Sequence, residues 1–140
     1  CEQSAPDPSP STEDVTALLR YVDLLDRPSG ELFEWQQRET DDPNVTVFPW
    51  VDYKPVVRKF QQELSQRGFV YPFDWGEWED EALRLHFEPG AMNQATFDDL
   101  RKLLTLHVRK DRFWTGHFAA ALEEGWIIGI LRRLKVIHEQ

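Results

Sequence analysis

The amino-acid sequence predicts a mainly α fold of the α+β class, a single-domain helical bundle of about six helices with one small β-hairpin. Three observations support this prediction. Apolar residues recur at spacings of three and four along most of the chain, as on a helix with one buried face. Residues that begin or end helices bound these segments. Only one region shows the alternation of a β-strand, and 140 residues suffice for one sizeable core.

Residues 1–11 are rich in Pro and Ser and carry too little apolar surface to order themselves. We therefore expect a disordered tail, followed by one globular domain over residues 12–140. Ser11 or Thr12 caps the first helix, and Asp14 completes a capping box with Ser11. This helix ends before Pro28, and its apolar stripe comprises Val15, Leu18, Leu19, Val22 and Leu25.

The segment Leu32–Tyr53 has a different pattern. Aromatic and β-branched residues, among them Phe33 and Trp35, occur on both sides of Asp41-Asp-Pro-Asn44. Pro and Asn are typical turn residues, and alternating β-branched and aromatic residues are typical of strands. The segment therefore predicts a short hairpin, with Val45-Thr-Val47 in the second half.

Five further helices are expected. Pro55 suits the first turn of one, which Gly68 ends. Asp74 is the expected N-cap of the next, which carries Trp75 and Trp78 and stops at Pro89. Thr96 and Asp99 form a second capping box for a helix whose inner face comprises Leu100, Leu103, Leu104, His107 and Val108. A short helix through Phe118, Ala121 and Leu122 and a final helix with Ile127, Ile130, Leu131, Leu134 and Ile137 inward complete the bundle.

The charge is distributed unevenly along the chain. Residues 1–100 hold 8 basic and 21 acidic side chains, net −13, and residues 101–140 hold 8 basic and 4 acidic ones, net +4, which sum to the net charge of −9. The acidic total argues against nonspecific binding of nucleic acid or anionic lipid. The basic end favours either docking of the last helices on the acidic part or a local site for anions.

Cys1 is the only cysteine, so we expect neither an intramolecular disulfide nor a cysteine zinc site. No apolar stretch is long enough to cross a membrane. Cys1 with the Pro/Ser-rich residues after it is also similar to the start of a mature, lipid-anchored bacterial lipoprotein. We favour the interpretation that Cys1 is a remnant of cloning or processing.

The densest group of chemically active side chains lies between His107 and His117. His107 and Asp111 are four residues apart on one helix face, where a carboxylate orients an imidazole as a general base requires. The same face carries leucines, so a buried structural His–Asp pair is the more common outcome. Asp111 equally suits the N-cap of the following helix. If the protein is an enzyme, His107 and Asp111 are the predicted catalytic residues.

Arg109, Arg112 and His117 predict a second kind of site, because guanidinium groups bind phosphate or carboxylate with two hydrogen bonds. Trp114 is expected to line this site and Arg132 and Arg133 to face it, while Gly116 exposes backbone N–H groups. The alternative, which is narrowly favoured, is that these arginines pair with Asp98, Asp99, Glu123 or acids of the N-terminal part. We expect no metal site and no cofactor, because the four histidines show no ligand spacing. His86 and His138 are isolated in the sequence.

Two weaker patterns remain. Asp74-Trp-Gly-Glu-Trp78 places aromatic faces beside carboxylates, which suits a cation or a sugar ring, although tryptophans at helical spacing usually lie in the core. Ala121, Gly125 and Leu131 have the offsets of a helix-turn-helix motif. The last helix would begin with unusually apolar residues for DNA recognition, so an ordinary helical hairpin is favoured.

The runs Phe73-Asp-Trp-Gly-Glu-Trp78, Leu100-Arg-Lys-Leu-Leu-Thr-Leu-His-Val-Arg-Lys-Asp-Arg-Phe113, Gly116-His-Phe118, Glu124-Gly125 and Ile130-Leu-Arg-Arg-Leu134 together resemble an uncharacterised bacterial family, one of the domains of unknown function. The resemblance covers about residues 45–137 and is most specific from Leu100 to Leu134. It implies a small bacterial or phage-borne protein in the cytoplasm and assigns no activity. Trp114 departs from the pattern, where a small or sulfur-bearing residue is expected.

These observations favour a non-catalytic binding or regulatory module. Its basic, aromatic-lined site around Arg109, Arg112 and His117 would bind an anionic small molecule or the acidic surface of a protein partner. One alternative is a hydrolase or transferase that acts on a phosphorylated substrate through His107, Asp111 and an arginine. Another is a DNA-binding regulator that uses the last two helices, although a nucleic-acid partner is not favoured. The sequence leaves the oligomeric state open.

Overall fold

The computed structural model describes residues 10–36, 42, 44 and 49–139. The predicted mainly α fold with one small β-hairpin is confirmed. In chain order, the elements are α1 (Thr12–Leu19), α2 (Tyr21–Leu24), the 3-10 turn η1 (Ser29–Glu31), β1 (Phe33–Gln36), β2 (Trp50–Tyr53), α3 (Pro55–Gln66), α4 (Glu79–Phe87), the 3-10 turn η2 (Met92–Gln94), α5 (Phe97–Lys110), α6 (His117–Glu123) and α7 (Trp126–Glu139).

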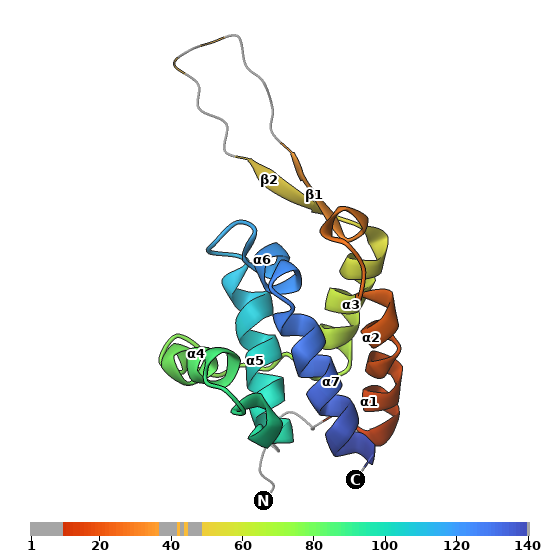
Figure 1. Cartoon of the computed structure of the whole chain (residues 1–140). Helices are drawn as coiled ribbons and strands as arrows, with labels where there is room; N and C mark the ends of the chain where they lie inside the picture. Colours follow the sequence, from red (N-terminus) through yellow and green to blue (C-terminus); the bar gives the residue numbers. More distant parts are fainter. Residues whose placement is uncertain (1–9, 37–41, 43, 45–48, 140) are drawn as a thin grey trace, which may run out of the picture.

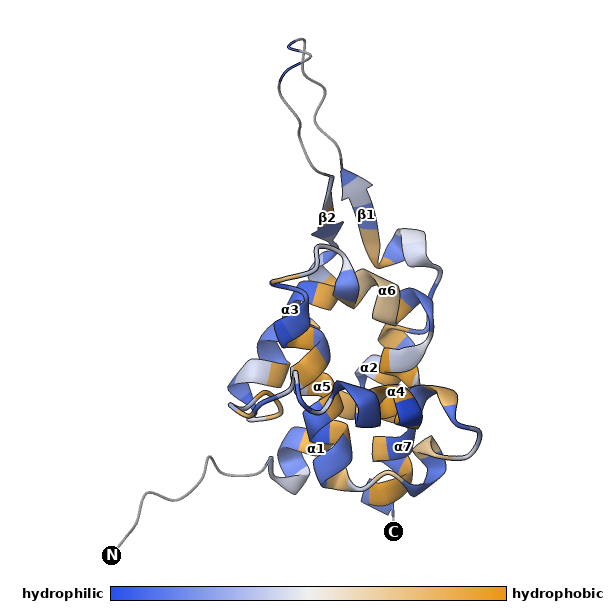
Figure 2. Cartoon of the chain, turned by 90° about the vertical axis from the view of Figure 1, so that its left-hand side faces the viewer, coloured by the Kyte–Doolittle hydropathy of each residue, from blue (hydrophilic) through white to orange (hydrophobic). Residues whose placement is uncertain are grey.

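Helix α7 is at the centre of the helical body. It packs against α1, α2, α5, α6 and η2 (Figure 1). Figure 2 shows hydrophobic residues of the helices turned toward the interior. Ile127, Ile130 and Leu131 of α7 are fully buried, and each such side chain contributes about 1.5–3 kcal/mol through the area it removes from water. The apolar spacing of the last helix therefore predicts its buried face correctly.

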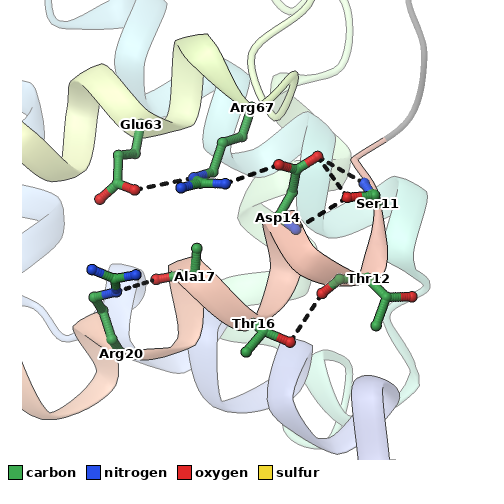
Figure 3. Close-up of polar contacts among 8 residues, drawn as sticks. All are labelled: Ser11, Thr12, Asp14, Thr16, Ala17, Arg20, Glu63 and Arg67. Carbon is green, nitrogen blue, oxygen red and sulfur yellow. Dashed lines mark hydrogen bonds and ion pairs between the residues drawn. The ribbon is translucent and has the colours of Figure 1, made fainter.

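The first helix is interrupted. The Ser11 hydroxyl accepts a hydrogen bond from the Asp14 N–H, and an Asp14 carboxylate oxygen accepts from the Ser11 N–H, so the predicted capping box is present (Figure 3). The single helix predicted up to Leu25 is instead two segments, α1 and α2, on either side of Arg20. The Arg20 side chain donates to the Ala17 carbonyl at this break. The interruption leaves Tyr21 buried against α3.

A polar cluster joins the first helices to α3. Arg67 donates to Glu63 and to Asp14, each at 3.0 Å (Figure 3), and the Tyr21 hydroxyl donates to the other oxygen of Glu63. Burial by itself would raise the pKa of Glu63, but the hydrogen bonds from Tyr21 and Arg67 outweigh it and lower that pKa below its usual value. Glu63 is therefore an ionised carboxylate that links α1, α2 and α3.

The hairpin projects from one end of the helical body, opposite the C-terminus (Figure 1). Strands β1 and β2 are antiparallel, and Phe33 lies opposite Tyr53 at the base, where both are buried. Farther along, the Trp35 and Trp50 side chains are about half exposed. The predicted strand residues Val45–Val47 lie outside the described residues, so the hairpin is established here by residues 33–36 and 50–53.

The prediction that Asp74 is the N-cap of the helix that carries Trp75 and Trp78 is wrong. Helix α4 begins at Glu79, and residues 75–78 form a turn. Asp74 accepts only a long hydrogen bond, 3.4 Å, from the Glu77 N–H, and Gly76 disfavours a helix. The Trp75 ring instead lies 6.0 Å from the ring of Phe113, centroid to centroid, so a contact between distant segments overrides the local capping signal.

Helices α5, α6 and α7 occur where they are predicted. The Thr96–Asp99 capping box is present at the start of α5. Gly116 and Gly125 lie before α6 and α7 with φ of 85° and 81°, a left-handed conformation that glycine adopts without a steric penalty. The short connection between α5 and α6 turns the chain at residues 111–116, and this corner holds three of the predicted site residues, Asp111, Arg112 and Trp114.

Candidate functional site

Asp111 stabilises the corner between α5 and α6. One of its carboxylate oxygens accepts hydrogen bonds from the Phe118 N–H, at 2.9 Å, and from the Tyr53 hydroxyl, at 3.1 Å. The Tyr53 oxygen in turn accepts from the Ala119 N–H. Burial and then the negative charge of Asp111 raise the pKa of Tyr53, so its hydroxyl stays a donor. Asp111 therefore satisfies the Phe118 N–H at the start of α6 and, through the Tyr53 hydroxyl, ties that helix to the hairpin.

His107 has other partners than the expected Asp111. Its ring is buried, with 1% of its surface exposed, and it lies in the middle of a row of three histidines. Its Nε2 atom is 3.0 Å from Nε2 of His86, and its Nδ1 atom is 3.0 Å from Nε2 of His117. His86, which is isolated in the sequence, is thus a direct neighbour. The row comprises one side chain each from α4, α5 and α6.

The surroundings of this row favour neutral imidazoles. Burial lowers the pKa of His86 to about 4, and burial together with the neighbouring histidines lowers that of His107 well below its ordinary value. Burial and the positive charge of Lys110 lower the pKa of His117, and Asp111 and Glu79 offset only part of this. The sequence suggested that a carboxylate would favour a charged His107. The fold has the opposite effect on the pKa of His107, first because the ring is buried and then because its polar neighbours are other imidazoles.

The space beside the histidines is small. A cavity of about 80 Å³ adjoins them, walled by Glu79, Lys110 and Trp126 together with neighbouring apolar residues. Glu79 forms an ion pair with Lys110 at 2.5 Å, and the Trp126 ring stacks on His86. The catalytic alternative requires an accessible His107, and this geometry does not meet that requirement. Within the described residues, no three His, Cys, Asp or Glu side chains are grouped to hold a metal ion.

A larger pocket lies on the other side of the α5 C-terminus. It has a volume of about 320 Å³, and Arg109, Arg112 and Phe113 line it together with the segment before α4. That segment contributes Tyr71, Pro72, Phe73 and Trp75. Arg109 lies in the last turn of α5, and Arg112 lies three residues later in the turn that follows the helix. The structure therefore brings together two of the predicted ligand-binding arginines with an aromatic wall.

The two pocket arginines differ from the other arginines that the structure describes. Each of the others donates a hydrogen bond from its guanidinium group to a carboxylate or a backbone carbonyl. Within residues 10–36, 42, 44 and 49–139, the guanidinium groups of Arg109 and Arg112 have no such partner. The alternative of pairing with acids fits Arg132, which pairs with Asp26, but among the described residues Arg109 and Arg112 have no such pair, while Asp98 pairs with Lys102 and Asp99 caps α5.

The aromatic wall has an ordered and an exposed part. The rings of Tyr71 and Phe73 stack at 5.2 Å, and the Arg101 guanidinium lies 4.1 Å from the centre of the Tyr71 ring. Trp75 and Phe113 are tilted by 38° to each other, and 71% of Phe113 is exposed. Sequence reasoning noted the aromatic run around Trp75 but did not connect it with Arg109 and Arg112. The signal was the density of aromatic residues between Phe69 and Trp78.

The remaining predicted ligand residues lie elsewhere. His117 belongs to the histidine row, and Trp114 is 63% exposed with the Lys110 ammonium 5.4 Å from its ring centre. Arg133 donates to the Ala95 carbonyl and does not face the arginines of α5. The pocket lining includes none of these three side chains. Of the five predicted ligand-binding residues, the fold thus unites Arg109 and Arg112.

Two other features bear on function. A pocket of about 320 Å³ lies near the start of α1 and the end of α7, with a partly aliphatic lining that includes Val15, Leu134 and Ile137. Helix α7, the expected DNA-reading helix of the alternative prediction, is buried among five other elements, and Arg132 on it pairs with Asp26. A recognition helix must enter the major groove of DNA, so this position does not favour the DNA-binding alternative. No helix among the described residues is long and apolar enough to cross a membrane.

Comparison with known proteins identifies the family. No curated protein and no solved structure gives a significant match to the chain. A family model does match, over residues 10–140, which include the histidine row and the arginine pocket, and the resemblance to a domain of unknown function is thereby confirmed. The chain belongs to DUF6508, a family of unknown function.

Proposed function

We propose that the protein is a non-catalytic binding module that holds an anionic ligand with Arg109 and Arg112. The observation that carries this proposal is that both guanidinium groups line one pocket and neither has a partner among the described residues. The chain has 25 acidic and 16 basic side chains, so acids are abundant. Two arginines without an acidic partner in such a chain favour an external anion as their partner.

The chemistry of the pocket supports this role. Two guanidinium groups three residues apart repel each other, and an anion between them would remove that repulsion. Arg binds phosphate and carboxylate through paired hydrogen bonds, which Lys does not match. A volume of about 320 Å³ is in the range of pockets for small molecules, which favours a small anion over the acidic surface of a protein.

The test is a titration of the ¹⁵N-labelled protein with inorganic phosphate, monitored by two-dimensional NMR. We expect the Arg109 and Arg112 side-chain Nε–H signals and the Trp75 indole signal to shift. The double variant Arg109→Gln/Arg112→Gln should lose the response. Arg132→Gln is the control, because it removes one positive charge from an exposed arginine outside the pocket.

Ionic strength provides a second readout. Partly exposed charges are screened by salt over a Debye length of about 8 Å at physiological ionic strength, so added sodium chloride should weaken phosphate binding. If the double variant binds phosphate as the unaltered protein does, the two arginines are not the binding groups and the proposal is wrong. The same holds if phosphate causes no shift at low salt.

A further inference from the structure

We infer that the ligand of the arginine pocket carries its anionic group on a planar aromatic ring, as in an aryl phosphate or an aromatic carboxylate. This inference rests on the proposed function and adds the ligand class. Five of the seven lining residues, Tyr71, Pro72, Phe73, Trp75 and Phe113, carry rings, and the other two are the arginines.

Apart from Pro72, the apolar side chains of this lining are all aromatic, namely Tyr71, Phe73, Trp75 and Phe113. The pocket near the start of α1, of equal volume, is lined in part by Val15, Leu134 and Ile137. Aliphatic walls accept any apolar group of the right size. Aromatic faces add a preference for flat rings, because the quadrupoles of two rings favour offset-stacked and edge-to-face arrangements.

Phe113 is the side chain left open for such a contact. Its ring touches Trp75 on one side, at 6.0 Å between centroids, and remains 71% exposed. The Tyr71 ring, by contrast, already contacts Phe73 and the Arg101 guanidinium. A ligand ring that covers Phe113 would remove its exposed face from water.

The position of the charges completes the argument. Arg112 directly precedes Phe113, and Arg109 lies one turn earlier, so cation and ring line the same pocket. Guanidinium groups bind an anion at their edge and stack on aromatic rings with their face. A ligand that joins an anionic group to a ring therefore fits both parts of the pocket, whereas a simple anion fits only the arginines.

The experiment compares three phosphates with the whole protein: inorganic phosphate, cyclohexyl phosphate and phenyl phosphate. Dissociation constants come from the shift of the Trp75 indole signal and from calorimetry. We expect phenyl phosphate to bind about three- to tenfold more tightly than cyclohexyl phosphate, the range given by one aromatic pair. Benzoate and cyclohexanecarboxylate repeat the comparison with a carboxylate. A preference for the flat ring in either series supports the inference and identifies the anionic group.

Phe113→Leu tests the assigned ring. It should abolish the preference for phenyl over cyclohexyl phosphate and leave inorganic phosphate binding unchanged. The matched control is Phe87→Leu, at a phenylalanine of α4 that is 64% exposed and outside this pocket. Because both rings are exposed, both variants should keep the thermal unfolding midpoint of the unaltered protein.

The outcomes separate the two proposals. If cyclohexyl and phenyl phosphate bind equally, and cyclohexanecarboxylate equals benzoate, the aromatic inference is wrong while the anion site stands. If Phe113→Leu keeps the preference for the flat ring, the assignment to Phe113 is wrong. If none of the five compounds binds, the proposed anion site itself is wrong.

Discussion

The Nε2 atom of His86 lies 3.0 Å from the Nε2 atom of His107, which is buried between two helices. A hydrogen bond between two imidazole nitrogens requires one protonated and one unprotonated atom. Three neutral rings can form both hydrogen bonds of the row. In one arrangement His117 donates to His107 and His107 donates to His86, and in the other both bonds run the opposite way. An additional proton would place a positive charge in an apolar setting near Lys110, with only Glu79 and Asp111 as nearby acids.

The first prediction is a loss of stability in mild acid. The pKa of His86 is about 4 in the folded protein, and those of His107 and His117 are also lowered, against about 6.5 in an unfolded chain. Between these values the unfolded chain binds protons that the folded chain does not. The contribution of the neutral histidine row to the free energy of unfolding is therefore fully present above about pH 6.5 and is lost as the pH falls toward 4. From about pH 7.5 to pH 5, we expect the free energy of unfolding to decrease by on the order of 1–2 kcal/mol, measured by urea unfolding.

This pH window is separate from that of the carboxylates. The pKa values of Asp14 and Glu63 are lowered, so their contribution is present above the ordinary carboxylate range and is lost only at lower pH. His107→Leu should reduce the slope between about pH 7.5 and pH 5. His138→Gln, outside the row, should keep it. If the free energy of unfolding stays constant across this pH range, protonation of the histidine row does not destabilise the fold and the prediction is wrong.

The second prediction concerns Gly116, where two constraints coincide. Its φ is 85°, and a Cβ atom at this position would lie 2.6 Å from Cζ2 of Trp35. Gly90 has a φ of 82° and nothing within 4 Å of such an atom, so it isolates the backbone constraint. Gly90→Ala should destabilise by about 1 kcal/mol. Gly116→Ala should destabilise by about 1 kcal/mol more, because the Trp35 ring must move.

Thermal unfolding of both glycine variants measures the difference. In a Trp35→Val background the ring is gone, and the cost of Gly116→Ala should fall to that of Gly90→Ala. Equal costs in the unaltered background would contradict the close packing of Trp35 on Gly116.

The third prediction concerns the Tyr21 hydroxyl, which donates to Glu63 in the interior. Tyr21→Phe removes this donor and should lower the free energy of unfolding by about 1–2 kcal/mol, as expected for a buried hydrogen bond to a charged acceptor. Tyr71→Phe is the control, because the Tyr71 hydroxyl has no hydrogen-bond partner among the described residues. It should change stability by less than about 0.5 kcal/mol in urea unfolding. If Tyr21→Phe and Tyr71→Phe lower the free energy of unfolding equally, the Tyr21–Glu63 hydrogen bond does not stabilise the fold as proposed.

The fourth prediction separates a structural from a catalytic role for Asp111. Asp111→Ala leaves the Phe118 N–H and the Tyr53 hydroxyl without their common acceptor. We expect a loss of about 1–2 kcal/mol, similar to the removal of a helix cap. Asp74→Ala is the control, since Asp74 accepts only the 3.4 Å bond from Glu77, and it should cost less than about 0.5 kcal/mol. Unchanged stability of Asp111→Ala in urea unfolding would contradict the capping role.

Much of the fold follows from local patterns. The two capping boxes, at Ser11 and at Thr96, are present as predicted, and Pro55 begins α3. These signals work because each depends on residues within one turn of a helix. The start of α4 was predicted wrongly at Asp74, since the packing of Trp75 against Phe113 outweighs a cap whose effect is of the order of one hydrogen bond.

The candidate site divides in the same way. The sequence by itself determined that a dense group of polar residues lies between His107 and His117, where α5 ends and α6 begins. Only the tertiary structure decided that His107 contacts His86 and His117, and that the segment from Tyr71 to Trp75 forms the wall beside the arginines. The reason is physical. Helical periodicity fixes the direction of a side chain relative to its own axis, whereas the partner across a helix interface depends on how whole helices pack.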